Sequence, residues 1–171
     1  LAAIDLVVEL LDARAPSSSQ NHQIAQLTVG KQRLIILHKA DRSDPRVTSR
    51  WIFHFKDQGY DAQAFSIYWP HSRRSFLKQL QERERKLAPA YGRRSLRVMV
   101  VGVPNVGKSS FINFLVKKKA APTGNRPGIT RGRQWIKLLA GVELLDTPGI
   151  LYPRLSEKSA LPLMALGAVP A

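Results

Sequence analysis

Residues 96–110 read LRVMVVGVPNVGKSS. The run Leu96 to Val101 is strongly apolar and predicts a buried strand. The next stretch, Gly102 to Ser109, fits the pattern G-x-x-x-x-G-K-[ST], and a helix is expected after it, with an apolar face made by Phe111, Phe114 and Leu115. In this context, glycines let backbone N–H groups surround a phosphate, and the helix N-terminus adds its positive end. The stretch therefore predicts a phosphate-binding loop.

This loop offers a side chain for each part of a nucleotide phosphate. We expect Lys108 to reach the β and γ phosphates as a catalytic group, and Ser109 to give its hydroxyl to Mg²⁺. The other loop residues expected at the nucleotide are Pro104, Asn105, Val106, Gly107 and Ser110. The alternative is a glycine-rich turn without a ligand, but chance produces the pattern in only on the order of 1 in 100 chains of this length.

Two later segments complete a phosphate site. The sequence ELLDTPG, Glu143 to Gly149, is an apolar strand ending in Asp-x-x-Gly. We expect Asp146 to hold Mg²⁺, and the Gly149 N–H to face the γ phosphate and sense it. Between the two motifs lies NRPGIT, in which Thr130 is the candidate for a second Mg²⁺ hydroxyl. Taken alone, the two segments could be an Asp-initiated turn and a Pro-Gly turn.

A base-binding element precedes the loop. In RLIILHKADRSD, residues 33–44, an apolar strand ends in Lys-x-Asp. Asp41 can accept both the N1–H and the N2 amino group of guanine, which adenine cannot match. Lys39 can cover the base plane and reach the phosphate loop. We expect a backbone N–H at Ser66 or Ile67, which end the next strand, to donate to guanine O6.

Charge indicates the partner class. The chain has 171 residues, with 27 Lys and Arg against 12 Asp and Glu, for a net charge of +15. Such an excess favours a polyanion, with nucleic acid first and an acidic membrane surface second. The absence of cysteine excludes disulfides and thiolate metal sites.

Strands alternating with helices predict a mainly parallel sheet covered on both faces. Besides the strands named above, we expect strands at 4–11, 62–67 and 134–139 and helices at 44–59 and 72–88. In the first of these helices Val47, Trp51 and Phe55 are expected to form the buried face. The stretch DARAPSSSQN, which begins at Asp12, is expected to be a polar loop.

At these motifs the chain resembles the circularly permuted GTPases of the ribosome biogenesis GTPase A (YlqF) type. The resemblance runs from LLDARAPSSSQN through HKAD, GVPNVGKSS, NRPGIT and QWIK to LLDTPGIL, with the base motif ahead of the phosphate loop. It implies a three-layer Ras-like P-loop fold with permuted strand order, and a GTP-hydrolysing assembly factor that binds rRNA on a ribosomal subunit. It also implies a permuted domain at 1–155 and a tail at 156–171 leading to a C-terminal domain absent from this chain.

The chain departs from the usual GTPase pattern at several positions. His38 replaces the asparagine of Asn-Lys-x-Asp, so we expect weaker binding with guanine selectivity kept. Ile67 replaces an alanine, and its bulkier side chain is expected to tighten the base slot. Ile150 stands where Ras-like proteins orient water with glutamine, which predicts slow intrinsic hydrolysis. Asn105 matches the asparagine that binds K⁺ in potassium-stimulated GTPases, so K⁺ and a ribosomal partner are expected to raise the rate.

Two rival functions remain at this point. One is an ATP-using P-loop enzyme, which Asp41 opposes. The other is an RNA-binding module with a degraded nucleotide site, which His38 and Ile150 favour. The chain is expected to be monomeric and cytoplasmic, with an organelle as the alternative location, and no membrane span is visible in its sequence.

Overall fold

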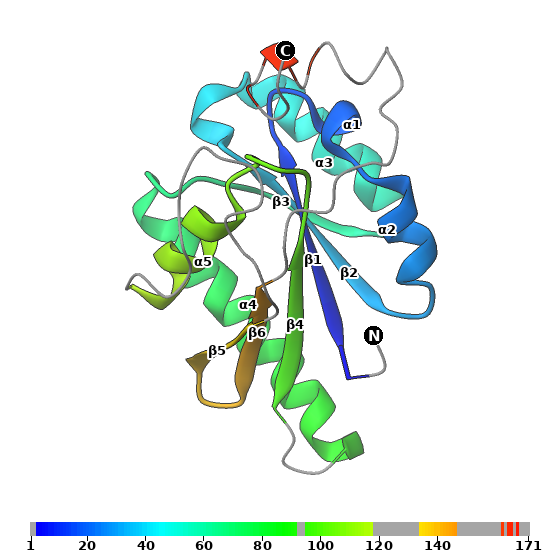
Figure 1. The fold of residues 1–171 in the computed structure, drawn as a ribbon, viewed down its shortest axis with the longest axis vertical. Helices are drawn as coiled ribbons and strands as arrows, with labels where there is room; N and C mark the ends of the chain where they lie inside the picture. The colour runs from blue at the N-terminus through cyan, green and yellow to red at the C-terminus, as the bar shows by residue number, and fades with distance from the viewer. Residues whose placement is uncertain are drawn as a thin grey trace.

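The computed structural model describes residues 3–91, 95–117, 134–146, 162, 164, 165 and 167. Its centre is a sheet in the order β3-β2-β1-β4-β6-β5, in which every neighbouring pair is parallel except β5 and β6 (Figure 1). The strands are β1 (Leu6–Asp12), β2 (Gln32–His38), β3 (Asp61–Phe65), β4 (Leu96–Val101), β5 (Gln134–Leu139) and β6 (Val142–Asp146). The strand before the phosphate loop, β4, therefore lies between the base-motif half and the β6–β5 half.

Helices cover both faces of the sheet (Figure 1). They are α1 (Pro16–Ser19), α2 (His22–Leu27), α3 (Pro45–Asp57), α4 (Pro70–Tyr91) and α5 (Lys108–Val116), with a 3₁₀ turn at Ala40–Arg42. This is the three-layer, mainly parallel and circularly permuted P-loop architecture that the sequence predicts. None of the helices in the described part of the chain is long and apolar enough to cross a membrane.

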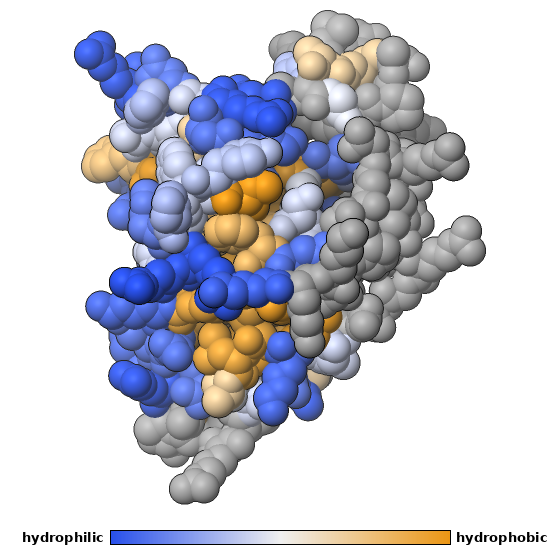
Figure 2. All heavy atoms as spheres, turned by 90° about the vertical axis from the view of Figure 1, so that its left-hand side faces the viewer, coloured by the Kyte–Doolittle hydropathy of each residue, from blue (hydrophilic) through white to orange (hydrophobic). Residues whose placement is uncertain are grey.

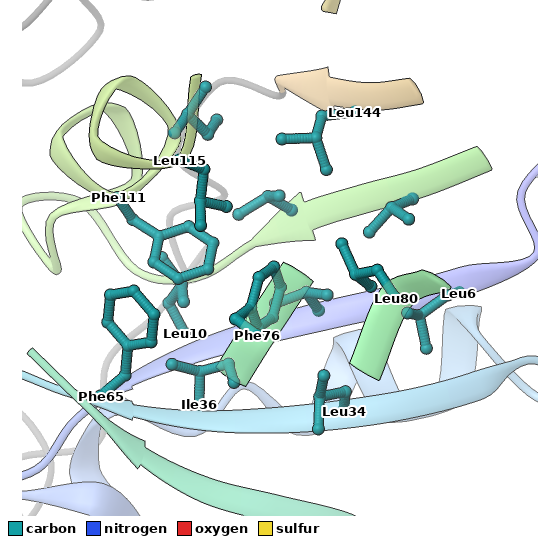
Figure 3. Close-up of a cluster of buried hydrophobic side chains, with 14 of the residues drawn as sticks. Leu6, Leu10, Leu34, Ile36, Phe65, Phe76, Leu80, Phe111, Leu115 and Leu144 are labelled. Carbon is teal, nitrogen blue, oxygen red and sulfur yellow. The ribbon is translucent and has the colours of Figure 1, made fainter. Parts of the chain in front are cut away.

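Period-two alternation in β1 divides the core between the faces. Leu6, Val8 and Leu10 join a cluster with α4 and α5 that includes Phe76 and Phe111 (Figure 3). Leu11, on the other face, packs in a second cluster under α3. All of β1 is buried, as expected for a strand with helices on both sides.

The side of the molecule that carries α5 shows hydrophilic residues around a central apolar band (Figure 2). Partly buried residues border the α4/α5 cluster, among them Ile67, Phe114 and Val116. These partly buried side chains lie between the buried α4/α5 cluster and the surface of this face.

Two local expectations were wrong. The stretch DARAPSSSQN is not wholly a loop but contains α1, because Pro16 begins α1 and buried Ser19 donates its hydroxyl to the Ala15 carbonyl at 2.8 Å. The helix α2, which follows this stretch, was not among the expected helices. The buried face of α3 uses Thr48 and Phe55, whereas Val47 is 47% exposed. The Thr48 hydroxyl can be buried because it donates to the Asp44 carbonyl at 2.9 Å. Asp44 caps α3, since its carboxylate accepts from the N–H groups of Arg46 and Val47.

Candidate nucleotide-binding site

The predicted motifs meet at the carboxyl edge of the sheet. Register pairs Asp12 with His38 and His38 with Phe65, so the base motif lies beside the ends of β1 and β3. On the other side of β1, β4 ends at Val101 and enters the phosphate loop, and β6 pairs Asp146 with Val100. Ligands of open α/β sheets bind at this edge, where strand order allows loops to diverge.

The phosphate loop is held tightly against the sheet. A Cβ atom at Gly102 would lie 2.7 Å from the Leu10 carbonyl oxygen, so only glycine fits this approach to β1. Pro104 and Val106 are buried, and Asn105 has a left-handed backbone with φ of 56°. The Lys108 ammonium donates to the Gly102 and Val103 carbonyls at 3.2 and 3.3 Å. Backbone carbonyls of the loop thus accept hydrogen bonds from Lys108, the residue that begins α5.

The His38 ring packs against the phosphate loop at Gly107. Gly107 has φ of 106°, and a Cβ there would lie 3.0 Å from His38 Cε1. The imidazole is 3% exposed, stacks on Phe65 with ring centroids 6.1 Å apart, and meets the edge of Phe111 at 6.2 Å. Neither ring nitrogen has a hydrogen-bond partner among the described residues. The histidine that replaces the usual asparagine therefore packs as an aromatic wedge between the base motif and the phosphate loop.

This environment keeps His38 neutral. Burial, together with the positive charge of Lys39, lowers the pKa of its imidazole to about 4, although the charges of Asp12 and Asp41 oppose the shift. At neutral pH the ring has one N–H donor and one acceptor nitrogen. The neutral ring therefore contributes packing rather than charge to the site.

Lys39 joins the base motif to the phosphate loop. Its backbone is left-handed, with φ of 59°, at the start of the 3₁₀ turn. Its ammonium donates to the Asn105 carbonyl at 3.2 Å, across 66 residues of sequence, and to Asp12 Oδ2 at 3.0 Å. The reach to the phosphate loop expected from the sequence is present, and the bond to Asp12 is an additional contact.

Asp41 is oriented by the next strand. Ser66, which is fully buried, donates its hydroxyl to Asp41 Oδ1 at 2.6 Å and accepts from the Tyr68 N–H at 3.0 Å. The Ser66 N–H itself lies 3.4 Å from the Ser72 hydroxyl. Ile67 is partly buried against the α4/α5 cluster. A carboxylate and a strand end thus converge where a guanine edge is expected.

The candidate Mg²⁺ and K⁺ residues are placed only in part. Ser109 lies in the first turn of α5, and Asp146 ends β6 in register with Val100 of β4, the strand that leads into the phosphate loop. A single hydroxyl with a single carboxylate fits Mg²⁺, which keeps several waters and phosphate ligands in such sites. Asn105 donates from Nδ2 to the Gly167 carbonyl at 3.0 Å. Thr130, Gly149 and Ile150 lie outside the described residues.

Sequence reasoning missed Asp12 and Arg14 as site residues. Four hydrogen bonds reach the Asp12 carboxylate, from the Arg14 N–H, Nε and Nη2 and from Lys39 Nζ. Burial would raise the pKa of Asp12, but the bonds and charges of Arg14 and Lys39 outweigh it and lower the pKa to about 2. The available signal was an Asp that ends an apolar strand beside β2, the strand that ends just before Lys39, because parallel strands end at one edge of a sheet.

Comparison with known proteins agrees with this geometry. A family described as "50S ribosome-binding GTPase" matches residues 97–165. Ribosome biogenesis GTPase A of Priestia megaterium is 44% identical over 93% of this chain and 57% of its own length. The GNP-bound YlqF from T. maritima superposes with a TM-score of 0.70 at 36% identity, covering 99% of this chain and 63% of that one.

The GDP-bound YlqF structure gives a TM-score of 0.69 at 35% identity, again over 99% of this chain. The chain spans about three fifths of the length of these relatives, which are 57% and 63% covered. The motifs, their permuted order and the sheet order all agree with these matches. The chain therefore belongs to the ribosome biogenesis GTPase A (YlqF) family.

Proposed function

We propose that this chain binds GTP at the carboxyl edge of its sheet, hydrolyses it to GDP and phosphate, and serves in ribosomal-subunit assembly. The observation that carries the proposal is the bond from Lys39 Nζ to the Asn105 carbonyl, which joins a guanine-type motif to a phosphate loop. Relatives named ribosome biogenesis GTPase A and neighbours bound to GDP and GNP support the same reading.

Guanine selection falls to Asp41. Its carboxylate accepts the N1–H and N2 amino group, and its orientation by the Ser66 hydroxyl fixes the angle of approach. Lys39 covers one face of the base, and a backbone N–H of Ser66 or Ile67 donates to O6. Adenine presents the opposite donor and acceptor pattern, so it loses these bonds and leaves the carboxylate unpaired.

Phosphate binding falls to the loop at 102–110. Lys108 exchanges its two carbonyl acceptors for the β and γ phosphates, which carry full negative charge and form stronger bonds. Backbone N–H groups of Asn105, Val106, Gly107 and Ser110 and the start of α5 add positive potential. Pro104 has no N–H and contributes shape only.

Mg²⁺ is proposed at Ser109, Thr130 and Asp146, where it would neutralise charge that develops on the phosphates. The Gly149 N–H is proposed to sense the γ phosphate. Ile150 cannot orient water through its side chain, so we expect slow intrinsic hydrolysis that K⁺, held by the Asn105 side-chain oxygen, increases. Equal hydrolysis rates in Na⁺ and K⁺ would remove the role of K⁺.

The partner is proposed to be rRNA in a ribosomal subunit. The net charge of +15 supplies the attraction, and binding to rRNA should weaken steeply with salt. Among the basic residues, Arg73 donates to the Leu115 carbonyl at 2.8 Å and so acts inside the fold, whereas Arg74 and Lys117 are exposed. The expectations of a monomer and of a cytoplasmic location remain predictions.

The deciding experiment is calorimetric titration with GDP and with ADP in Mg²⁺ buffer. We expect clear preference for GDP, and loss of at least about a hundredfold in GDP affinity for Asp41→Asn, because an amide donor then faces guanine donors. Asp44→Asn is the matched control, since asparagine also caps α3 and the site stays intact. Equal binding of both nucleotides, or none, would favour the RNA-binding module instead.

A further inference from the structure

Asp12 occupies a central place in the site that its sequence context does not announce. It ends β1, is 3% exposed, and lies in register beside His38. Its own N–H donates to the Ser19 hydroxyl at 2.9 Å, which fixes the backbone. Both carboxylate oxygens are in use, Oδ1 by Arg14 alone and Oδ2 by Arg14 and Lys39 together.

Lys39 requires such an anchor. Its side chain is long and flexible, so holding it in one conformation costs rotamer freedom. Its backbone is left-handed, which is unfavourable for a residue other than glycine. Within the described residues its ammonium has two acceptors, Asp12 Oδ2 and the Asn105 carbonyl, which hold it from opposite sides of the junction between base motif and phosphate loop.

Arg14 in turn fixes the orientation of the Asp12 carboxylate. Its Nε and Nη2 donate to the two oxygens of Asp12 at 2.9 and 2.7 Å, a bidentate arrangement that fixes the carboxylate plane. Asp12 and Asp41 both attract the Arg14 guanidinium and raise its pKa. Positive and negative charges therefore alternate from Arg14 through Asp12 to Lys39 at the edge of the base site.

We propose that Asp12, held by Arg14, is a positioning residue for guanine nucleotide binding, acting by fixing Lys39 against the Asn105 carbonyl of the phosphate loop. The inference rests on the proposed function, because Lys39 matters only if the site binds a nucleotide. Asp12 touches no nucleotide atom in this scheme. Its effect on affinity must therefore pass through Lys39.

A double-mutant cycle tests this dependence. GDP affinity is measured for Asp12→Asn in the wild-type background and in Lys39→Met, from the rise in melting temperature over a series of GDP concentrations, which also registers weak binding. We expect about a tenfold loss in the wild-type background, which is about 1.4 kcal/mol. In the Lys39→Met background we expect less than about a twofold loss, because coupled residues are not additive.

Arg14→Gln provides the second variant if Asp12→Asn does not fold. It leaves Asp12 charged but unfixed, so we expect about a threefold loss that also disappears in Lys39→Met. Asp61→Asn is the matched control, since it breaks the ion pair with Arg83 at the opposite end of β3 and should leave GDP affinity within about twofold.

The outcomes separate the two ideas. Unchanged affinity in Asp12→Asn, or equal losses in both backgrounds, would overturn the positioning role while the proposed function stands. If Asp12→Asn does not fold, Arg14→Gln is used in its place. Unchanged GDP affinity in Arg14→Gln, or equal losses in the wild-type and Lys39→Met backgrounds, would then overturn the positioning role. A wild-type chain that does not prefer GDP to ADP would overturn the proposed function and this inference with it.

Discussion

Replacing His38 with asparagine should flatten the dependence of folding stability on pH. In the folded chain the pKa of His38 is lowered to about 4 from its ordinary value of 6.5, mainly by burial. The unfolded chain therefore binds the proton more readily in the window between these values. The stability contribution is complete above pH 6.5 and is lost as pH falls toward 4.

The linkage relation gives the magnitude. From about pH 7.5 to about pH 5, the two pKa values remove on the order of 2 kcal/mol of unfolding free energy. The assay is urea unfolding at both pH values without nucleotide, for wild type, His38→Asn and the control His54→Asn, whose histidine is exposed.

We expect the loss between the two pH values to be smaller by on the order of 2 kcal/mol in His38→Asn and unchanged in His54→Asn. Only this difference is compared, because the absolute stability of His38→Asn also includes lost packing. An equal loss in wild type and His38→Asn would show that the imidazole is hydrated or already charged, and would refute the wedge between Phe65 and Phe111.

Two further substitutions test the packing around the site. Gly107→Ala should cost more stability than Gly59→Ala in thermal unfolding, by about 1–3 kcal/mol. Both glycines have positive φ, but only at Gly107 does the added Cβ meet His38, and equal costs would contradict that contact. Glu9→Ala should cost about 3–5 kcal/mol in urea unfolding because it leaves the guanidinium of Arg33 buried without its ion pair. Replacing both members with leucine and methionine should recover most of that loss, and failure to recover would assign the cost to packing.

Much of the fold was predictable because its strands are apolar and end in recognisable loops. Five expected strands agree with β1, β2, β3, β4 and β6 to within a few residues, and the bounds expected for β5 are the observed ones. The short helices α1 and α2 could not be recognised from their polar composition. Their polar groups are satisfied by tertiary contacts, such as the Asp12 N–H on the Ser19 hydroxyl, which local sequence does not reveal.

Most residues of the candidate site were predictable, and so was the contact of Lys39 with the phosphate loop, but Asp12, Arg14 and most other contacts were not. Lys39 and Asp41 were identified from the guanine pattern, yet their partners Asp12 and Ser66 lie 27 and 25 residues away. Val47 was assigned to the buried face of α3 by its hydrophobicity, but Thr48 takes that place because its hydroxyl bonds within the helix. Periodicity identifies a helix more reliably than it identifies the exact side that packs.

The position of β1 has a consequence during synthesis of the chain. Its residues Leu6–Glu9 pair with Val98–Val101 of β4, which leave the ribosome about ninety residues later. At translation rates of about 5–20 residues per second, one edge of the most buried strand stays unpaired for several seconds. An exposed apolar strand edge is a template for association with other chains. Because the permuted chain places β1 long before β4, the growing polypeptide depends on protection of the unpaired edge of β1 until β4 has been synthesised.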